Sequence, residues 1–162
     1  MKQRQRTSKE LSVFISYAHE DEYFKNELLK HLEGIKRNKL ITTWDDSQIL
    51  PGQPWDAVIK QKLAKSDIII FLISADFLAS AYCNEVEIKK AIGRHKKGEA
   101  TLIPIIVRHC DFESSSLSQI QALPKFAKPV ASWEDQDEAW LDVVKFLKIL
   151  IAKPIRVPTP TF

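Results

Sequence analysis

The chain has 162 residues, of which 44% are hydrophobic and 28% are charged, and its 24 basic and 21 acidic side chains give a net charge of +3. This composition is typical of one globular domain and excludes a disordered or fibrous chain. The small, scattered charge excludes nucleic-acid binding through the bulk electrostatic field. The longest apolar runs, at 68–73 and 102–107, are far shorter than the about 20 residues that a membrane-spanning helix needs. We therefore expect a cytoplasmic protein that binds no membrane, with Cys83 and Cys110 as reduced thiols.

Hydrophobic periodicity predicts strands that alternate with helices along the chain. In chain order we expect a strand at 12–17, a helix from Tyr23 to about Asn38, a strand at 40–44, a helix at 55–65, a strand at 67–74, a helix at 81–97, strands at 101–107 and 130–131, and a helix at 134–152. This alternation predicts an open, mainly parallel sheet of five strands with helices on both faces. Pro104 lacks a backbone donor, so the fourth strand should lie toward an edge.

Composition changes mark the limits of the domain. Residues 1–10 have the pattern of a basic, disordered tail, residues 11–152 form the domain, and residues 153–162 are a Pro-rich tail or linker. The last segment either tethers a sensor module in a longer protein or ends a small one.

Three unusual segments, 16–21, 45–55 and 74–87, follow predicted strands. Ligands of open α/β sheets bind beyond the carboxyl ends of the strands, so the site is expected there. With only four glycines, no glycine-rich phosphate loop is present. Ser16, His19 and Asp21 have the residue types of a hydrolytic triad, but three residues on one turn seldom reach its geometry.

Two other site classes that suit such a sheet are also disfavoured. The adjacent residues His109, Cys110 and Asp111 cannot all face one metal ion. A receiver-type phosphorelay site needs an acidic pair after the first strand, an aspartate after the third and a lysine after the fourth. Here Ser74 follows the third strand and Arg108 follows the fourth. We expect no metal ion and no cofactor.

Three motifs together resemble a known family. FISYAHED, WDDSQILPGQPW and SADFLASAYCNEVEIKKA are similar, in this order, to motifs of Toll/interleukin receptor (TIR) domains of bacterial type, and the resemblance extends from about Leu11 to Leu150. It implies a flavodoxin-like, three-layer α/β fold around a five-stranded parallel sheet. The loop at 45–55 corresponds to the BB loop of the family, and ILPG matches its Pro-Gly signature. Asp45 and Asp46 replace the Arg-Asp pair that is common before this signature.

Many TIR domains cleave nicotinamide from NAD⁺ with a glutamate on the helix that follows the third strand. The resemblance therefore implies an NAD⁺ glycohydrolase, a hydrolase that yields ADP-ribose or cyclic ADP-ribose and takes NAD⁺ as its substrate. Glu85 and Glu87 compete for the catalytic role. Glu87 is preferred because it directly precedes an apolar residue, as in the bacterial pattern YCxxxE[MI]K, and because it lies one helical turn after Cys83. The alternative for Glu87 is a solvated helix face.

The same resemblance implies a set of substrate-binding residues around the catalytic glutamate. They are Ser16, Tyr17, Trp44, Asp46, Trp55, Tyr82 and Cys83. The alternative for each aromatic residue is packing in the core or at its rim. The tryptophan that often stands four residues before the catalytic acid is absent, and Tyr82 lies nearby instead.

Family active sites are often completed by the BB loop of a neighbouring protomer, so other TIR protomers are expected partners in a head-to-tail assembly or filament. The residues expected to mediate self-association are Ile49, Leu50, Pro51 and Gly52. The alternative for Leu50 is that it caps the domain's own core. At the level of function, two hypotheses stand: an NADase that acts as an effector or signal producer in bacterial antiphage defence, switched on by assembly, or a non-catalytic adaptor that mediates homotypic protein interaction.

Overall fold

The computed structural model describes residues 9–80 and 86–153. The strands are β1 (Leu11–Ser16), β2 (Ile41–Trp44), β3 (Ile68–Ile73) and β4 (Thr101–Ile106). The α-helices are α1 (Glu22–Arg37), α2 (Trp55–Lys65), α3 (Ala75–Ala79), α5 (Val86–Lys96) and α6 (Gln136–Ala152). Short 3₁₀ segments complete the order: η1 (His19–Asp21), η2 (Asp46–Gln48), η3 (Phe112–Ser114), η4 (Ser116–Gln119), η5 (Lys125–Ala127) and η6 (Val130–Ser132). Within these residues, no helix has the length and apolar character needed to cross a membrane.

The four strands form one parallel sheet in the order β2-β1-β3-β4. Strand β3 lies in the interior of the sheet, and all six of its residues are buried, as its uninterrupted apolar sequence predicted. The chain runs from β1 to β2 on one side and then crosses back to β3, so the direction of strand order reverses beside β1. The carboxyl end of β1 is therefore the expected binding position for a ligand.

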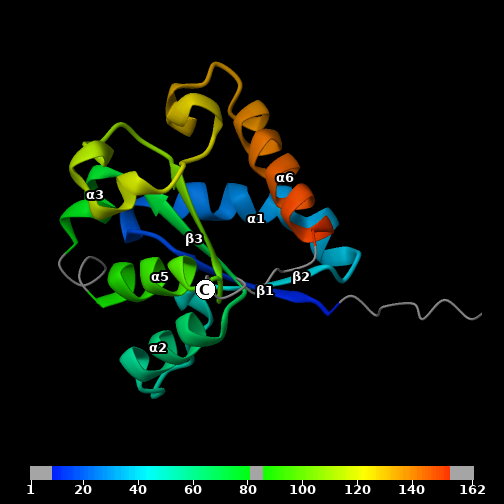
Figure 1. Cartoon of the computed structure of the whole chain (residues 1–162), viewed down its shortest axis with the longest axis vertical. Coiled ribbons are helices and arrows are strands. Elements are labelled where there is room, and N and C mark those ends of the chain that lie inside the picture. The colour runs from blue at the N-terminus through cyan, green and yellow to red at the C-terminus, as the bar shows by residue number, and fades with distance from the viewer. Residues whose placement is uncertain (1–8, 81–85, 154–162) are drawn as a thin grey trace, which may run out of the picture.

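Helices cover both faces of the sheet, which confirms the predicted three-layer α/β fold (Figure 1). Side chains at alternate strand positions point to opposite faces. Val13 and Ile15 of β1 pack in one core with residues of α1 and α6, whereas Phe14 packs in a second core with residues of α2 and α5. Figure 1 shows α1 and α6 together on one side of the strands and α2 and α5 on the other.

The predicted fifth strand at 130–131 is wrong, because Val130–Ser132 forms the 3₁₀ segment η6. Ala131 N does donate a hydrogen bond to Val107 O, at 2.9 Å, so the segment lies beside the end of β4. Pro129 has no N–H for a ladder, and the amide of Ser132 turns back to Pro129 O at 2.9 Å. These local bonds close a turn where a ladder would otherwise continue. The described residues thus contain a four-stranded sheet.

Strand β4 is an edge strand, as Pro104 predicted. Thr101 N and Val107 N donate to carbonyls of the β3 segment, so the even-numbered amides of β4 face away from the sheet. Ile106 N donates outward to Leu123 O at 2.9 Å, and Leu123 N donates back to Pro104 O at 2.8 Å. The ring nitrogen of Pro104 therefore faces away from β3, and its missing N–H costs no hydrogen bond between β3 and β4.

Candidate active site

Glu87 lies in the first turn of α5, on the side of the helix that faces the sheet. It is 6% exposed, and Ile88 beside it and Ala91 one turn later are also buried. Lys89 and Lys90 point to solvent. The alternative that Glu87 belongs to a solvated helix face is therefore wrong. A buried acid in the first turn of a helix needs a specific reason, since carboxylates are seldom buried unless they are paired.

The partner of Glu87 comes from the carboxyl end of β1. Period-two alternation places Ser16 on the same face of the sheet as Phe14, under α5. Ser16 Oγ donates a hydrogen bond to Glu87 Oε2 at 3.4 Å. Both side chains are buried, and they belong to segments that are 71 positions apart in the sequence.

A cavity of about 30 Å³ opens beside this pair. Its lining consists of Phe14, Ile15, Ser16, Tyr17, Trp44, Asp46, Trp55, Ile59 and Glu87. Six residues that the sequence marked as site residues are thus brought together: Ser16, Tyr17, Trp44, Asp46, Trp55 and Glu87. The predictions for Tyr82 and Cys83, and the competing acid Glu85, lie outside the described residues. The cavity is narrow in this arrangement, with room for about one or two water molecules.

The pKa of Glu87 is raised from an ordinary value of 4.5 to about 7, and burial is the main cause. The negative charges of Asp46 and Asp56 contribute to this increase, whereas the hydrogen bond from Ser16 opposes it. The carboxyl group therefore exchanges its proton near neutral pH. Perturbed titration of a buried acid at a ligand-binding edge is a common property of active sites.

The aromatic rings of the cavity have mixed roles. Trp44 stacks on Phe14 with ring centroids 5.5 Å apart, so it packs in the core and also lines the cavity. Trp55, the first residue of α2, keeps 43% exposure at the rim. The pKa of Tyr17 is raised, first by burial and then by Asp46 and Asp45, so its phenol keeps its proton. For Trp44, the expected role in the site and the alternative of core packing are therefore both compatible with the structure.

Sequence reasoning missed Lys25, whose buried ammonium group lies 3.7 Å from Asp45 Oδ1. The same Nζ lies 5.2 Å from the centroid of the Tyr17 ring. Asp45 also accepts a hydrogen bond from Ser47 N at 2.9 Å. Lys25 therefore ties α1 to the start of the loop between β2 and α2. The signal was present in the sequence, because Lys25 continues the three- and four-residue spacing of the buried residues Leu28 and Leu32.

A second buried carboxylate, that of Asp21, has a structural role. Arg108 Nε donates to Asp21 Oδ1 at 2.7 Å, and the hydroxyl of Ser74 donates to the same carboxylate. Arg108 also pairs with Asp76 at the start of α3. The network joins the loops that follow β1, β3 and β4. Because Ser16 and Asp21 have separate partners, the structure also excludes the hydrolytic triad on this turn.

The loop between β2 and α2 presents an apolar side chain to solvent. Leu50 is 66% exposed, so the alternative that it caps the core is wrong, whereas Ile49 packs against the core beneath α2 and α5. Leu50 N donates to Gln53 Oε1 at 2.8 Å, and Gln53 N donates to Leu50 O at 3.1 Å, which closes a turn. Gly52 has a φ of +88°, a left-handed conformation that favours glycine.

Comparison with known proteins gives a consistent family. The profile of the TIR domain family matches residues 13–141. The protein y4lF of Sinorhizobium fredii, described as uncharacterised, is 42% identical over 137 residues, which cover 85% of this chain and 42% of that protein. The chain thus spans less than half the length of this relative.

Two solved structures share the fold at low sequence identity. The TIR domain of the Toll-related receptor TRR-2 from Hydra magnipapillata has a TM-score of 0.60 and 22% identity, with 84% of this chain and 97% of that chain covered. The TIR domains of the activated Roq1 resistosome, which directly recognises the pathogen effector XopQ, have a TM-score of 0.62 and 18% identity, with 85% and 99% covered. The family profile, the fold and the three motifs agree, and the chain belongs to the family of TIR domains.

Proposed function

We propose that this TIR domain cleaves NAD⁺ between nicotinamide and ribose, with Glu87 as the catalytic carboxylate. The observation that carries the proposal is the position of Glu87: it is buried at the carboxyl edge of a parallel sheet, next to Ser16 and to aromatic rings of the cavity lining. Ligands of such sheets bind at this edge. A buried acid with few compensating contacts is costly to the fold, which favours a functional reason for keeping it.

The chemistry needs one carboxylate. The bond between C1′ and the nicotinamide nitrogen breaks, and its electron pair goes to the nitrogen, so nicotinamide leaves as a neutral ring. The ribose becomes an oxocarbenium ion, which the Glu87 carboxylate stabilises through its negative charge. Water then adds to C1′ and loses a proton, which gives ADP-ribose. Attack by adenine in place of water gives cyclic ADP-ribose. Because the leaving group is already cationic, no second carboxyl group is needed to protonate it.

The surrounding charges support a cationic substrate. Asp46 and Asp56 lie close enough to raise the pKa of Glu87, so they make the cavity negative. A nicotinamide ring with its positive charge is attracted to such a site, and its binding favours the ionised form of Glu87. The neutral dihydronicotinamide ring gains none of this attraction.

The loop between β2 and α2 supports activation by assembly, because Asp46 near its start and Trp55 at its end line the cavity beside Glu87. A contact that moves this loop would therefore change the shape of the cavity. Leu50 on this loop is exposed and apolar, as a docking contact requires. We therefore place the effector or signal-producing role in antiphage defence, as the family resemblance implies, under the control of contact between TIR protomers.

Incubation of the protein with NAD⁺, followed by chromatography of released nicotinamide, tests this function. The assay is run across a range of protein concentrations, and turnover per protomer should rise with concentration. Glu87→Gln should lower turnover at least ~100-fold, whereas Glu33→Gln, an exposed glutamate of α1, should retain it. Loss of turnover in Glu85→Gln together with its retention in Glu87→Gln would show that Glu85, and not Glu87, is the catalytic glutamate.

The second candidate function is that of a non-catalytic adaptor, and the exposure of Leu50 favours self-association with or without catalysis. An adaptor releases no nicotinamide at any concentration. If sedimentation shows concentration-dependent assembly while the chromatogram shows only intact NAD⁺, the adaptor function replaces the enzyme.

A further inference from the structure

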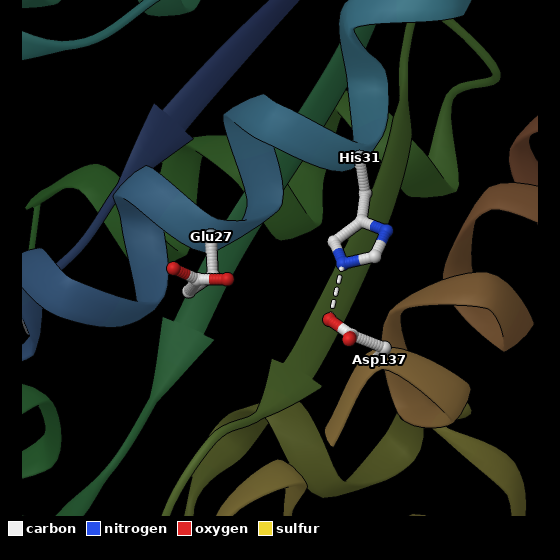
Figure 2. A group of neighbouring side chains, drawn as sticks. All are labelled: Glu27, His31 and Asp137. Atoms are coloured by element: carbon white, nitrogen blue, oxygen red, sulfur yellow. Dashed lines mark hydrogen bonds and ion pairs between the residues drawn. The ribbon is translucent and has the colours of Figure 1, made fainter. Parts of the chain in front are cut away.

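A group of metal-ligating side chains lies on the α1 and α6 side of the sheet, away from the cavity under α5. Glu27 and His31 stand one turn apart on α1, and Asp137 lies in the first turn of α6 (Figure 2). One ligand atom from each lies within 4.8 Å of the others. His31 Nε2 and Asp137 Oδ1 are already 3.1 Å apart.

The imidazole is held in place by packing. The His31 ring stacks on the fully buried ring of Trp140, with centroids 6.4 Å apart and an interplanar angle of 28°. This contact orients Nε2 toward α6, where Asp137 faces it (Figure 2). Side-chain exposure rises from 20% at both Glu27 and His31 to 73% at Asp137, so a hydrated ion can reach the group from solvent.

The competing contact of Glu27 is weak. Lys30 Nζ lies 2.9 Å from Glu27 Oε1, but the lysine side chain is 73% exposed. Surface ion pairs of this kind contribute little to stability, so a divalent ion can replace the ammonium group. The carboxylate of Glu27 is then available beside His31.

We propose that Glu27, His31 and Asp137 bind a divalent transition-metal ion, with zinc as the first candidate. One imidazole nitrogen and two carboxylate oxygens are ligand types that zinc accepts, at about 2.0–2.2 Å from the ion. Tetrahedral ligands at that distance are about 3.3 Å apart, so only small side-chain rotations separate the present arrangement from a bound one. The imidazole favours a transition metal over Mg²⁺ and Ca²⁺, which prefer oxygen ligands alone. Three protein ligands leave the fourth position for water.

Such an ion would join α1 to α6, whose ligands are 106 positions apart in the sequence. The unfolded chain does not hold these groups together, so the ion binds the native state and raises the melting temperature. The proposal does not depend on the proposed NAD⁺ cleavage, because none of the three proposed ligands lines the cavity beside Glu87.

The test uses the full chain, freed of metal with a chelator that is then removed. Calorimetric titration with ZnCl₂ should show one ion per chain, and the melting temperature should rise with zinc but not with Mg²⁺. His31→Gln and Asp137→Asn should each weaken zinc binding at least ~10-fold and remove the zinc-dependent rise. Glu33→Gln on the same helix and Cys110→Ser, which removes a free thiol, are matched controls that should bind zinc as the original chain does.

Two further measurements keep the result decisive. Circular dichroism checks that each variant is folded. Asp137→Asn changes an exposed side chain, so the packing of His31 on Trp140 is expected to remain. Co²⁺ in place of zinc should give a visible absorption band that His31→Gln loses. Zinc bound equally well by the folded His31→Gln and Asp137→Asn variants, zinc binding lost in Cys110→Ser, or no binding by the original chain would overturn the proposal.

Discussion

Ser16 Oγ lies 3.4 Å from Glu87 Oε2 and donates to that carboxylate inside the protein. The contact joins the end of β1 to the first turn of α5, two segments that the parallel sheet brings to the same edge. A hydroxyl donor favours the ionised form of a carboxylate, so Ser16 opposes the effects of burial and of Asp46 and Asp56 on Glu87. The pKa of Glu87 therefore depends on its burial and on three neighbouring side chains, those of Ser16, Asp46 and Asp56.

The proposed NAD⁺ cleavage should depend on pH through Glu87. The carboxylate form is the reactive one, so kcat/KM should rise with pH through about 7, the pKa of Glu87 in the free protein. Ser16→Ala removes a contact that lowers this pKa, and the rising limb should move to higher pH. Ser12→Ala, on the same strand but hydrogen-bonded to Asp67, is the control and should leave the limb in place. If the rise of kcat/KM with pH does not move in Ser16→Ala, Ser16 has no effect on the pKa of Glu87.

Glu87 should also destabilise the fold at neutral and alkaline pH. Its pKa is about 7 in the native state against about 4.5 in the unfolded chain, so the native state holds the extra proton between these values. Stability is therefore lost as pH rises from about 4.5 to about 7 and stays low above that. Glu87→Gln, which cannot ionise, should be more stable than the original chain by about 2–3 kcal/mol at pH 8.

This gain in Glu87→Gln should disappear at pH 4, where both chains are uncharged at position 87. Urea unfolding at the two pH values measures the difference. A gain of equal size at pH 4 and pH 8 would mean that shape, and not charge, is responsible.

Removal of one partner from the buried pair of Lys25 and Asp45 should be costly. Lys25→Met leaves the carboxylate of Asp45 buried without its cation, and a loss of about 3–5 kcal/mol is expected. Lys25→Met combined with Asp45→Asn removes both charges and should recover much of the loss. Denaturant unfolding of the two single variants and the double variant measures the coupling. Additive losses would show that the two side chains act independently.

Leu50→Asp should leave the monomer intact and impair assembly. The side chain is 66% exposed, so the change should alter stability by no more than about 0.5 kcal/mol. Sedimentation at high concentration should show loss of larger species, and NAD⁺ turnover should fall with it. Ile49→Asp, which places a charge against the core, should instead lower the melting temperature. If sedimentation is unchanged in Leu50→Asp, self-association uses a surface that does not include Leu50.

Local patterns were sufficient for most of the fold. The helix predicted at 55–65 has those bounds in the structure, and the apolar run of β3 is fully buried. The strand expected at 130–131 failed because two residues with strand propensity are too few to outweigh Pro129 and the turn bonds around it. Propensity predicts an element well only when many residues share it.

The site was harder to predict because its members depend on long-range contacts. The motifs indicated Glu87, but its burial depends on how α5 packs against the sheet and on the contact with Ser16 at the end of β1. Lys25 has the helical spacing of a core residue and the chemistry of a surface residue, and only the position of Asp45 decides between them. Glu27 and His31 are one helical turn apart, but Asp137 lies 106 positions after His31, so sequence spacing alone does not bring the three together.

The outer side of β4 has consequences for how copies of this chain can associate. Its three outward positions are Leu102, whose amide donates to His95 Nδ1 at 3.0 Å, Pro104, which has no amide hydrogen, and Ile106, whose amide donates to Leu123. This edge therefore offers no backbone donor to a strand from another molecule. Extension of the sheet, which is the usual route from an open edge to amyloid-like aggregation, is blocked on this side. Concentrated protein can thus bring its loops and helices into contact without polymerising through β4.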